Sequence, residues 1–190
     1  MPILPPEPSW FPQELFNASG PPFTGERMWW VLHTKPRQEK SLARQLHSAE
    51  AAFYLPLIER RGRVRGRPVT SHVPLFGGYV FLLGNRDERL TALGTRRVVQ
   101  TLEVKDQQGL WHDLCQLHRL IASGAPVTPE ERLAPGMTVE ITSGPLAGLN
   151  GKILRTASGR RFVVSVDFIQ QGASVLLEDF VLVRSEETVV

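Results

Sequence analysis

The sequence predicts an α+β protein with two folded domains, an antiparallel sheet flanked by helices and then a small all-β barrel. Over residues 28–124, short apolar strand patterns and helical periodicities interleave without a regular βαβ repeat. Over residues 135–184, short strand patterns recur without any helical period. With 190 residues and 42% apolar composition, the chain can bury a core in each domain.

Proline-containing stretches divide the chain. Residues 1–27 are rich in proline, which interrupts backbone hydrogen bonding, so we expect a mobile tail before the first domain at 28–124. Residues 125–134 suit a semi-extended linker to the barrel at 135–184, and residues 185–190 form a C-terminal tail. The tail also holds apolar side chains. They either dock on a partner or on the body of the protein, or have no binding role in a disordered tail. They are Trp10, Phe11, Leu15 and Phe16.

Each element of the first domain has its own signal. An apolar strand at 29–32 ends before Lys35-Pro36, because the residue before a proline avoids the helical region. A helix follows with Leu42, Leu46, Ala49 and Phe53 on one face. The remaining predicted elements are strands at 53–59, 69–74, 78–83 and 98–104, a short helix at 86–93, and a helix with an apolar face from 110 to 121 that ends at Gly124.

The barrel is predicted from five strand patterns separated by Gly, Asn, Ser or Asp. They lie at 138–142, 150–155, 161–167, 173–177 and 180–183. Closure into a barrel hides strand edges that would otherwise pair with other chains. Because valines dominate these segments, we expect a constitutive barrel.

Positive charge is concentrated in the first domain. Residues 28–124 carry 15 Lys and Arg against 8 Asp and Glu, a net charge of +7, whereas the segments before and after are each −2. An arginine run interrupted by glycines predicts a basic hairpin loop that binds nucleic acid through phosphates. The alternative is an exposed hairpin kept soluble by charge. The run contains Arg60, Arg61, Arg63, Arg65 and Arg67.

The sequence gives little support to catalysis, cofactors or membrane insertion. Gly144–Lys152 lacks the glycine spacing and the Ser or Thr of a phosphate-binding loop. His112, Cys115 and His118 recur on one helix without an evident fourth ligand, so we expect no metal. No histidine has a nearby nucleophile with an orienting carboxylate. With one cysteine, no long apolar run and no secretory signal pattern, we expect a monomeric, non-enzymatic cytoplasmic protein.

Three motifs in this order carry a family resemblance. They are Trp30-Val31-Leu32-His33-Thr34-Lys35-Pro36-Arg37, Pro74-Leu75-Phe76-Gly77-Gly78-Tyr79-Val80-Phe81 and Gly144-Pro145-Leu146-Ala147-Gly148-Leu149-Asn150-Gly151. Together they resemble the NusG-type transcription elongation factors, which join an N-terminal NGN domain to a C-terminal KOW domain with an SH3-like barrel. The resemblance covers about residues 28–184.

The resemblance implies a factor whose NGN domain binds the clamp helices of bacterial RNA polymerase and keeps transcription processive. It places the polymerase contact at Tyr79 and Phe81, with Trp30 and Phe76 as neighbours. The arginine run would then reach upstream DNA or the non-template strand. The KOW loop that grips ribosomal protein or Rho in housekeeping members aligns with a segment that contains Phe168 and Ile169.

Departures from the family pattern, together with the appended N-terminal tail, favour a specialised RfaH-like antitermination paralogue over the general factor. Gly77 stands where the family usually has proline, and the KOW loop lacks the expected glycine-arginine pair. The alternative function is an RNA-binding or ribosome-associated KOW protein. The acidic balance of the C-terminal segment favours a protein partner, because an RNA-binding barrel should be basic.

Overall fold

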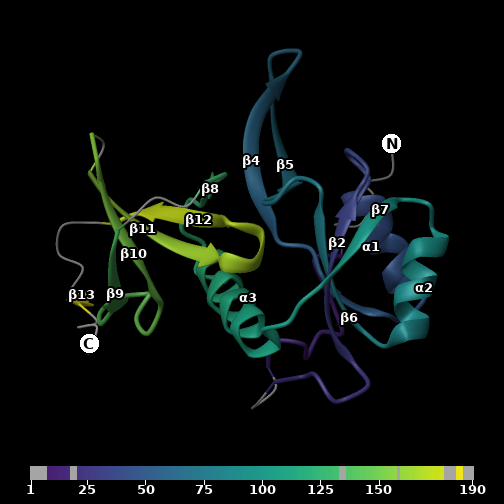
Figure 1. Ribbon diagram of the computed structural model, residues 1–190. Coiled ribbons are helices and arrows are strands. Elements are labelled where there is room, and N and C mark those ends of the chain that lie inside the picture. Colours follow the sequence, from purple (N-terminus) through teal and green to yellow (C-terminus); the bar gives the residue numbers. More distant parts are fainter. Residues whose placement is uncertain (1–7, 18–20, 133–135, 158, 178–182, 186–190) are drawn as a thin grey trace. The chain divides into compact units, whose positions relative to one another are not determined.

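The computed structural model describes residues 8–17, 21–132, 136–157, 159–177 and 183–185 (Figure 1). The chain forms two compact units, Met1–Gln108 and Gly109–Val190. The fold class is confirmed, since helices combine with antiparallel sheets in the order that the sequence predicts. None of the described helices is long and apolar enough to cross a membrane.

The first unit is built on a five-stranded antiparallel sheet. Its strands lie in the order β1-β3-β6-β2-β7, so the central pair joins two segments that are far apart in the sequence. The strands are β1 (Trp10–Phe11), β2 (Met28–Thr34), β3 (Ala52–Tyr54), β6 (Tyr79–Gly84) and β7 (Val98–Glu103). The edge strand β1 comes from the segment that the sequence assigns to a mobile tail, and it pairs with β3.

Two helices supply the core on one face of this sheet. Helix α1 (Glu39–Ser48) contributes Leu42 and Leu46, and helix α2 (Arg86–Gly94) contributes Ala92, to a buried cluster with sheet residues. An Asn85–Glu88 capping box satisfies the free N–H groups at the start of α2. Helix α1 ends earlier than its apolar spacing predicts, and Phe53 joins the same cluster from β3.

The basic run forms a long two-stranded ribbon rather than a loop. Strands β4 (Leu57–Val64) and β5 (Arg67–Pro74) are eight residues each and pair only with one another among the described residues. Arg65 and Gly66 form the turn with φ of 49° and 79°, as in a type I′ hairpin. A two-residue turn leaves the flanking arginines on the strands, so Arg65 alone of the five lies in the turn.

The second unit holds one helix and a six-stranded antiparallel sheet. Helix α3 (Gln107–Ala122) begins at the end of the first unit and continues into the second. The strand order is β13-β9-β10-β11-β12-β8, and the described residues show no pairing between the end strands. These strands are β8 (Thr128–Glu130), β9 (Met137–Ile141), β10 (Asn150–Thr156), β11 (Gly159–Val166), β12 (Gln171–Leu176) and β13 (Val183–Ser185).

The division of the chain differs from the one that its prolines indicate. The boundary falls after Gln108, within the first turn of α3, and the rest of this helix bonds to loops of the second unit. Arg119 donates to the carbonyl oxygens of Ala147 and Gly148 at 2.9 and 3.2 Å, and Asp113 accepts from the N–H of Asp167 at 3.0 Å. Helix α3 therefore belongs structurally with the predicted barrel, and Figure 1 shows it beside β11 and β12.

The predicted linker also contributes a strand. Within residues 125–134, β8 pairs with β12 at the edge of the second sheet. The buried hydroxyl of Ser174 accepts from Arg161 at 2.6 Å and donates to Glu130, and the Arg161–Glu130 ion pair spans 3.6 Å. Proline is compatible with this position because an edge strand leaves half of its backbone groups unpaired.

Candidate functional site

Strand register divides the first sheet into two faces. Side chains alternate along each strand, and residues opposite one another on neighbouring strands point to the same face. Val31 and Tyr54 are both opposite Phe81, and His33 is opposite Tyr79. We call this side, which is opposite to α1 and α2, the aromatic face. It consists of Trp29, Val31, His33, Ala52, Tyr54, Tyr79, Phe81 and Leu83.

The aromatic face is mostly buried, unlike the accessible surface that a polymerase contact at Phe81 would require. Phe81 is 0% exposed and Phe76 is 1% exposed, with their ring centroids 6.5 Å apart. Tyr79 is half-buried, and its ring lies 5.4 Å from that of His33. Four residues are predicted to contact polymerase. The structure brings Phe76, Tyr79 and Phe81 together, and of these three only Tyr79 is accessible.

Trp30 lies on the other face of the sheet. It is opposite Leu82 and packs against the core cluster beneath the helices. Its indole Nε1 donates to the carbonyl oxygen of Gly84 at 3.2 Å, and the guanidinium of Arg89 lies 4.6 Å from the ring centroid. Trp30 thus does not share a surface with Tyr79, and its contacts are those of a structural residue.

The backbone just before Tyr79 is held by a buried carboxylate that the sequence did not single out for this role. Glu39 in the first turn of α1 is 6% exposed and accepts from the N–H of Gly78 at 2.7 Å. The carbonyl oxygen of Gly78 accepts from the N–H of Thr34 at 2.8 Å. Gly78 adopts φ of +84°, a conformation that favours glycine. Together these bonds fix where β6 begins and so where Tyr79 points.

The β4–β5 ribbon presents cations on both of its faces. Arg61 and Arg63 share one face with Glu59, whereas Arg60 and Arg67 lie on the other. The Arg61 guanidinium donates to the Glu59 carboxylate at 2.9 Å, which lowers the pKa of Glu59 below its ordinary value. Glu59 is the single acidic residue in the sequence of the ribbon. The ribbon therefore combines high exposure with positive charge, as a phosphate-binding surface requires.

The predicted partner site of the second unit lies on a short 3-10 helix, η1 (Asp167–Ile169). Phe168 is 38% exposed, and Ile169 is half-buried. The bond from the N–H of Asp167 to Asp113 fixes this turn to α3. An exposed aromatic side chain on a fixed turn can anchor a protein partner at low entropic cost.

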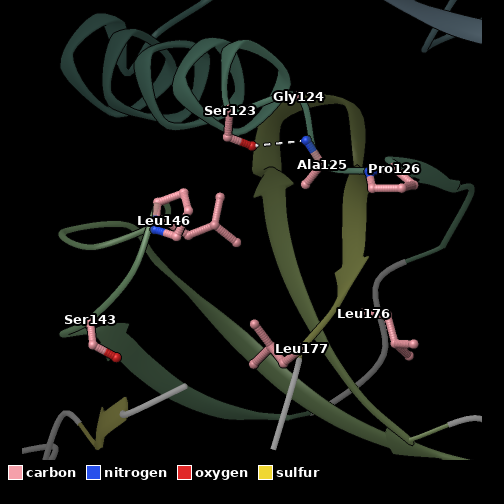
Figure 2. Close-up of a pocket in the computed structure, with 9 residues that line it drawn as sticks. Ser123, Gly124, Ala125, Pro126, Ser143, Leu146, Leu176 and Leu177 are labelled. Atoms are coloured by element: carbon pink, nitrogen blue, oxygen red, sulfur yellow. Dashed lines mark hydrogen bonds between the residues drawn. The ribbon is translucent and has the colours of Figure 1, made fainter. Parts of the chain in front are cut away.

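A separate cavity of about 330 Å³ opens elsewhere in the second unit (Figure 2). Leu146 and Leu177 line it, and the hydroxyl of Ser123 accepts from the N–H of Ala125 at 3.3 Å near its edge. Its walls are largely apolar and include neither Phe168 nor Ile169. The cavity offers few polar groups that would orient a small molecule.

The histidines and the cysteine of α3 do not converge on a metal site. Within the part of the chain that the structure describes, no group of three or more His, Cys, Asp or Glu is placed to hold an ion. Burial raises the pKa of the Cys115 thiol to about 11 and lowers the pKa of His118. His112 instead pairs with Gln116 at 3.2 Å. A thiol that stays protonated at neutral pH is a poor nucleophile and a poor ligand.

Comparisons with known proteins identify the first unit. Residues 27–109 match the sequence profile of the family described as "NusG: Transcription termination factor nusG". The solved structure titled "Domain interaction in Thermotoga maritima NusG" is 19% identical, with a TM-score of 0.44 over 80% of this chain and 93% of that one. No curated protein matches the chain. The match over residues 27–109 assigns this segment, which makes up most of the first unit, to the NusG N-terminal (NGN) domain.

Proposed function

We propose that this chain is a non-catalytic transcription elongation and antitermination factor that binds RNA polymerase through the aromatic face of its NGN domain. The observation that carries this proposal is the NusG match over residues 27–109, which includes β2, β3, β6 and β7. Three of these strands, β2, β3 and β6, provide every residue of the aromatic face. The fold of the family and the candidate surface therefore lie in the same segment.

Tyr79 is the central contact in this proposal. It is accessible at the start of β6, and the Glu39–Gly78 bond holds the backbone next to it. A tyrosine supplies large contact area with little conformational entropy to lose. The partner surface that fits such a site is an apolar stripe on protruding helices, as in the polymerase clamp.

The β4–β5 ribbon is proposed to bind upstream duplex or the non-template strand beside the polymerase. Phosphate contacts would position the factor without reading sequence. We also propose that the second unit recruits a further partner, such as ribosomal protein or Rho, through Phe168 and Ile169. The departures at Gly77 and in the KOW loop support a specialised RfaH-like role over that of the general factor.

Equilibrium binding to purified bacterial RNA polymerase tests the proposal. We expect Tyr79→Ala to weaken binding by about tenfold or more, as for a central aromatic contact. The matched control is Leu90→Ala on α2, because Leu90 is 49% exposed on the side of the sheet away from the aromatic face. A transcription assay across a terminator should show less read-through with Tyr79→Ala than with Leu90→Ala. Equal effects of the two substitutions would refute a specific site at Tyr79.

A second candidate function is an RNA-binding or ribosome-associated KOW protein. The turn at Gly144–Gly151 that resembles the KOW motif supports it, whereas the net charge of −2 over residues 125–190 opposes it. Measuring the affinity of the full chain for ribosomal RNA and for polymerase under the same salt conditions separates the two. Tight RNA binding with no affinity for polymerase would favour the second candidate.

A further inference from the structure

The N-terminal segment at residues 8–17 lies against the edge and the aromatic face of the first sheet. Trp10 and Phe11 of β1 pair with Tyr54 and Phe53 of β3. The N–H of Leu55 donates to the carbonyl oxygen of Ser9 at 2.6 Å and extends this pairing by one bond. We call residues 8–17 the cover segment.

Apolar side chains of the cover segment contact the aromatic face directly. The ring of Phe16 meets that of Tyr54 edge-on, with centroids 4.7 Å apart, and Tyr54 lies 6.4 Å from Phe81. Leu15 is 3% exposed. Pro12 and Leu15 also face Ala52 and Leu83 across a cavity of about 210 Å³. The segment therefore shields one side of the aromatic face and packs incompletely against it.

The backbone pairing of the cover segment is short compared with that of the central strands. Its ladder contains two residue pairs, whereas β2 and β6 are matched over six. Pro12 has no N–H to donate, and Gln13, Glu14 and Asn17 are exposed. Phe11 also packs on the core cluster, and its ring lies 5.1 Å from that of His47. Because ordering each residue costs conformational entropy, a segment with so short a ladder should be released at a lower free-energy cost than the strands with longer pairing.

We propose that the cover segment is an intramolecular competitor that must leave the aromatic face before RNA polymerase binds fully. This inference rests on the proposed function, since it assigns the covered residues to the polymerase site. Tyr79 stays accessible beside the covered region and provides the first contact. Release of residues 8–17 then uncovers Tyr54, Ala52 and Leu83 for an apolar helical partner, and frees the outer edge of β3.

Affinity for purified polymerase tests the competition in the full chain. Leu15→Ser/Phe16→Ser should raise the affinity by about tenfold or more, because apparent affinity scales with the fraction of molecules in the competent state. Gln13→Ser/Asn17→Ser is the matched control in the same segment, because both residues are exposed. A chain that lacks residues 1–17 should bind as tightly as the Leu15→Ser/Phe16→Ser variant.

Amide hydrogen exchange gives a readout that does not depend on polymerase. The amide of Leu55 should exchange at least tenfold faster in Leu15→Ser/Phe16→Ser than in the control, while the amides of β2 stay protected. Faster exchange with unchanged affinity would overturn the competition and leave the proposed function standing. If no variant binds polymerase, both proposals fail. Loss of a cooperative melting transition in both the serine variant and the shortened chain would show that residues 8–17 are core, which also overturns the proposal.

Discussion

The aromatic face and the β4–β5 ribbon belong to the same unit and differ in their exposure to solvent. Phe81 and Tyr54 of the aromatic face are 0% and 1% exposed, whereas residues 59–63 and 65–72 of the ribbon are all exposed. An apolar surface left open in water promotes association, so it needs a cover in the free protein. Arginines are stable in water and need none. Under the proposed function, the charged surface is thus ready in advance, whereas the apolar surface is uncovered when its partner binds.

The largest expected effect is on stability and concerns the aromatic face. Phe81→Ala should lower the free energy of unfolding by about 3–5 kcal/mol, because it leaves a cavity in a fully buried site. Val69→Ala on the ribbon, where Val69 is 42% exposed, should change it by about 0.5 kcal/mol or less. Denaturant unfolding of the two variants measures both values. If Phe81→Ala unfolds like the wild type yet loses polymerase binding, Phe81 is a contact residue and the contrast between the regions fails.

The next effect is on nucleic-acid binding and concerns the ribbon. Replacing Arg60, Arg61, Arg63, Arg65 and Arg67 together with alanine should weaken duplex DNA binding on the order of a hundredfold at 0.1 M salt. The slope of log affinity against log salt should fall in magnitude by about 3 to 5, since each neutralised phosphate contributes about 0.9. The melting temperature should change little, because these side chains are exposed. An unchanged slope would assign the arginines to solubility.

The sequence predicts well those elements whose signals are local. Strand β6 and helix α2 match their predicted ranges closely, since an apolar run follows Gly77-Gly78 and Asn85 caps the helix. The ribbon is predicted less well because both of its faces are exposed, so no apolar alternation reveals its strands. Its local signal was the Arg65-Gly66 pair, which suits a two-residue turn.

Features that depend on pairing between distant strands could not be predicted. Trp30 and Tyr79 both lie in apolar strands, but only the register of β2 against β6 places them on opposite faces. The role of Glu39 depends on a turn that is distant in sequence. The prolines predict a mobile tail, and they give no sign that Trp10 and Phe11 add a strand to β3. Each of these outcomes is set by tertiary contacts.

A smaller effect is expected at the turn that leads to Tyr79. Gly78→Ala should destabilise the first unit by about 1–2 kcal/mol, because its φ of +84° is costly for any residue with a Cβ. Gly77→Ala is the matched control, since a Cβ there meets nothing within 4 Å. Thermal melts compare the two, and polymerase affinity shows whether Tyr79 moves. Equal destabilisation by both substitutions would mean that the Gly78 conformation does not control this turn.

The smallest expected effect separates the two faces of the ribbon. Glu59 is ionised at neutral pH, as any exposed glutamate is, and its bond to Arg61 lowers its pKa further, so it offsets one cation on the face that Arg61 shares with Arg63. Glu59→Gln should raise affinity for duplex DNA by roughly two- to fivefold, the range expected for an exposed ion pair. It should also steepen the salt slope by about 1, because Arg61 becomes available for a phosphate.

Glu103→Gln on β7 is the matched control, since Glu103 is exposed and the substitution makes the same change in net charge outside the ribbon. Fluorescence anisotropy across a salt series measures both variants. If the two substitutions raise affinity equally, overall charge attracts the DNA and neither face of the ribbon is a specific phosphate contact. If Glu59→Gln alone steepens the slope, the Arg61 and Arg63 face contacts the phosphates, and the ion pair with Glu59 limits binding in the free protein.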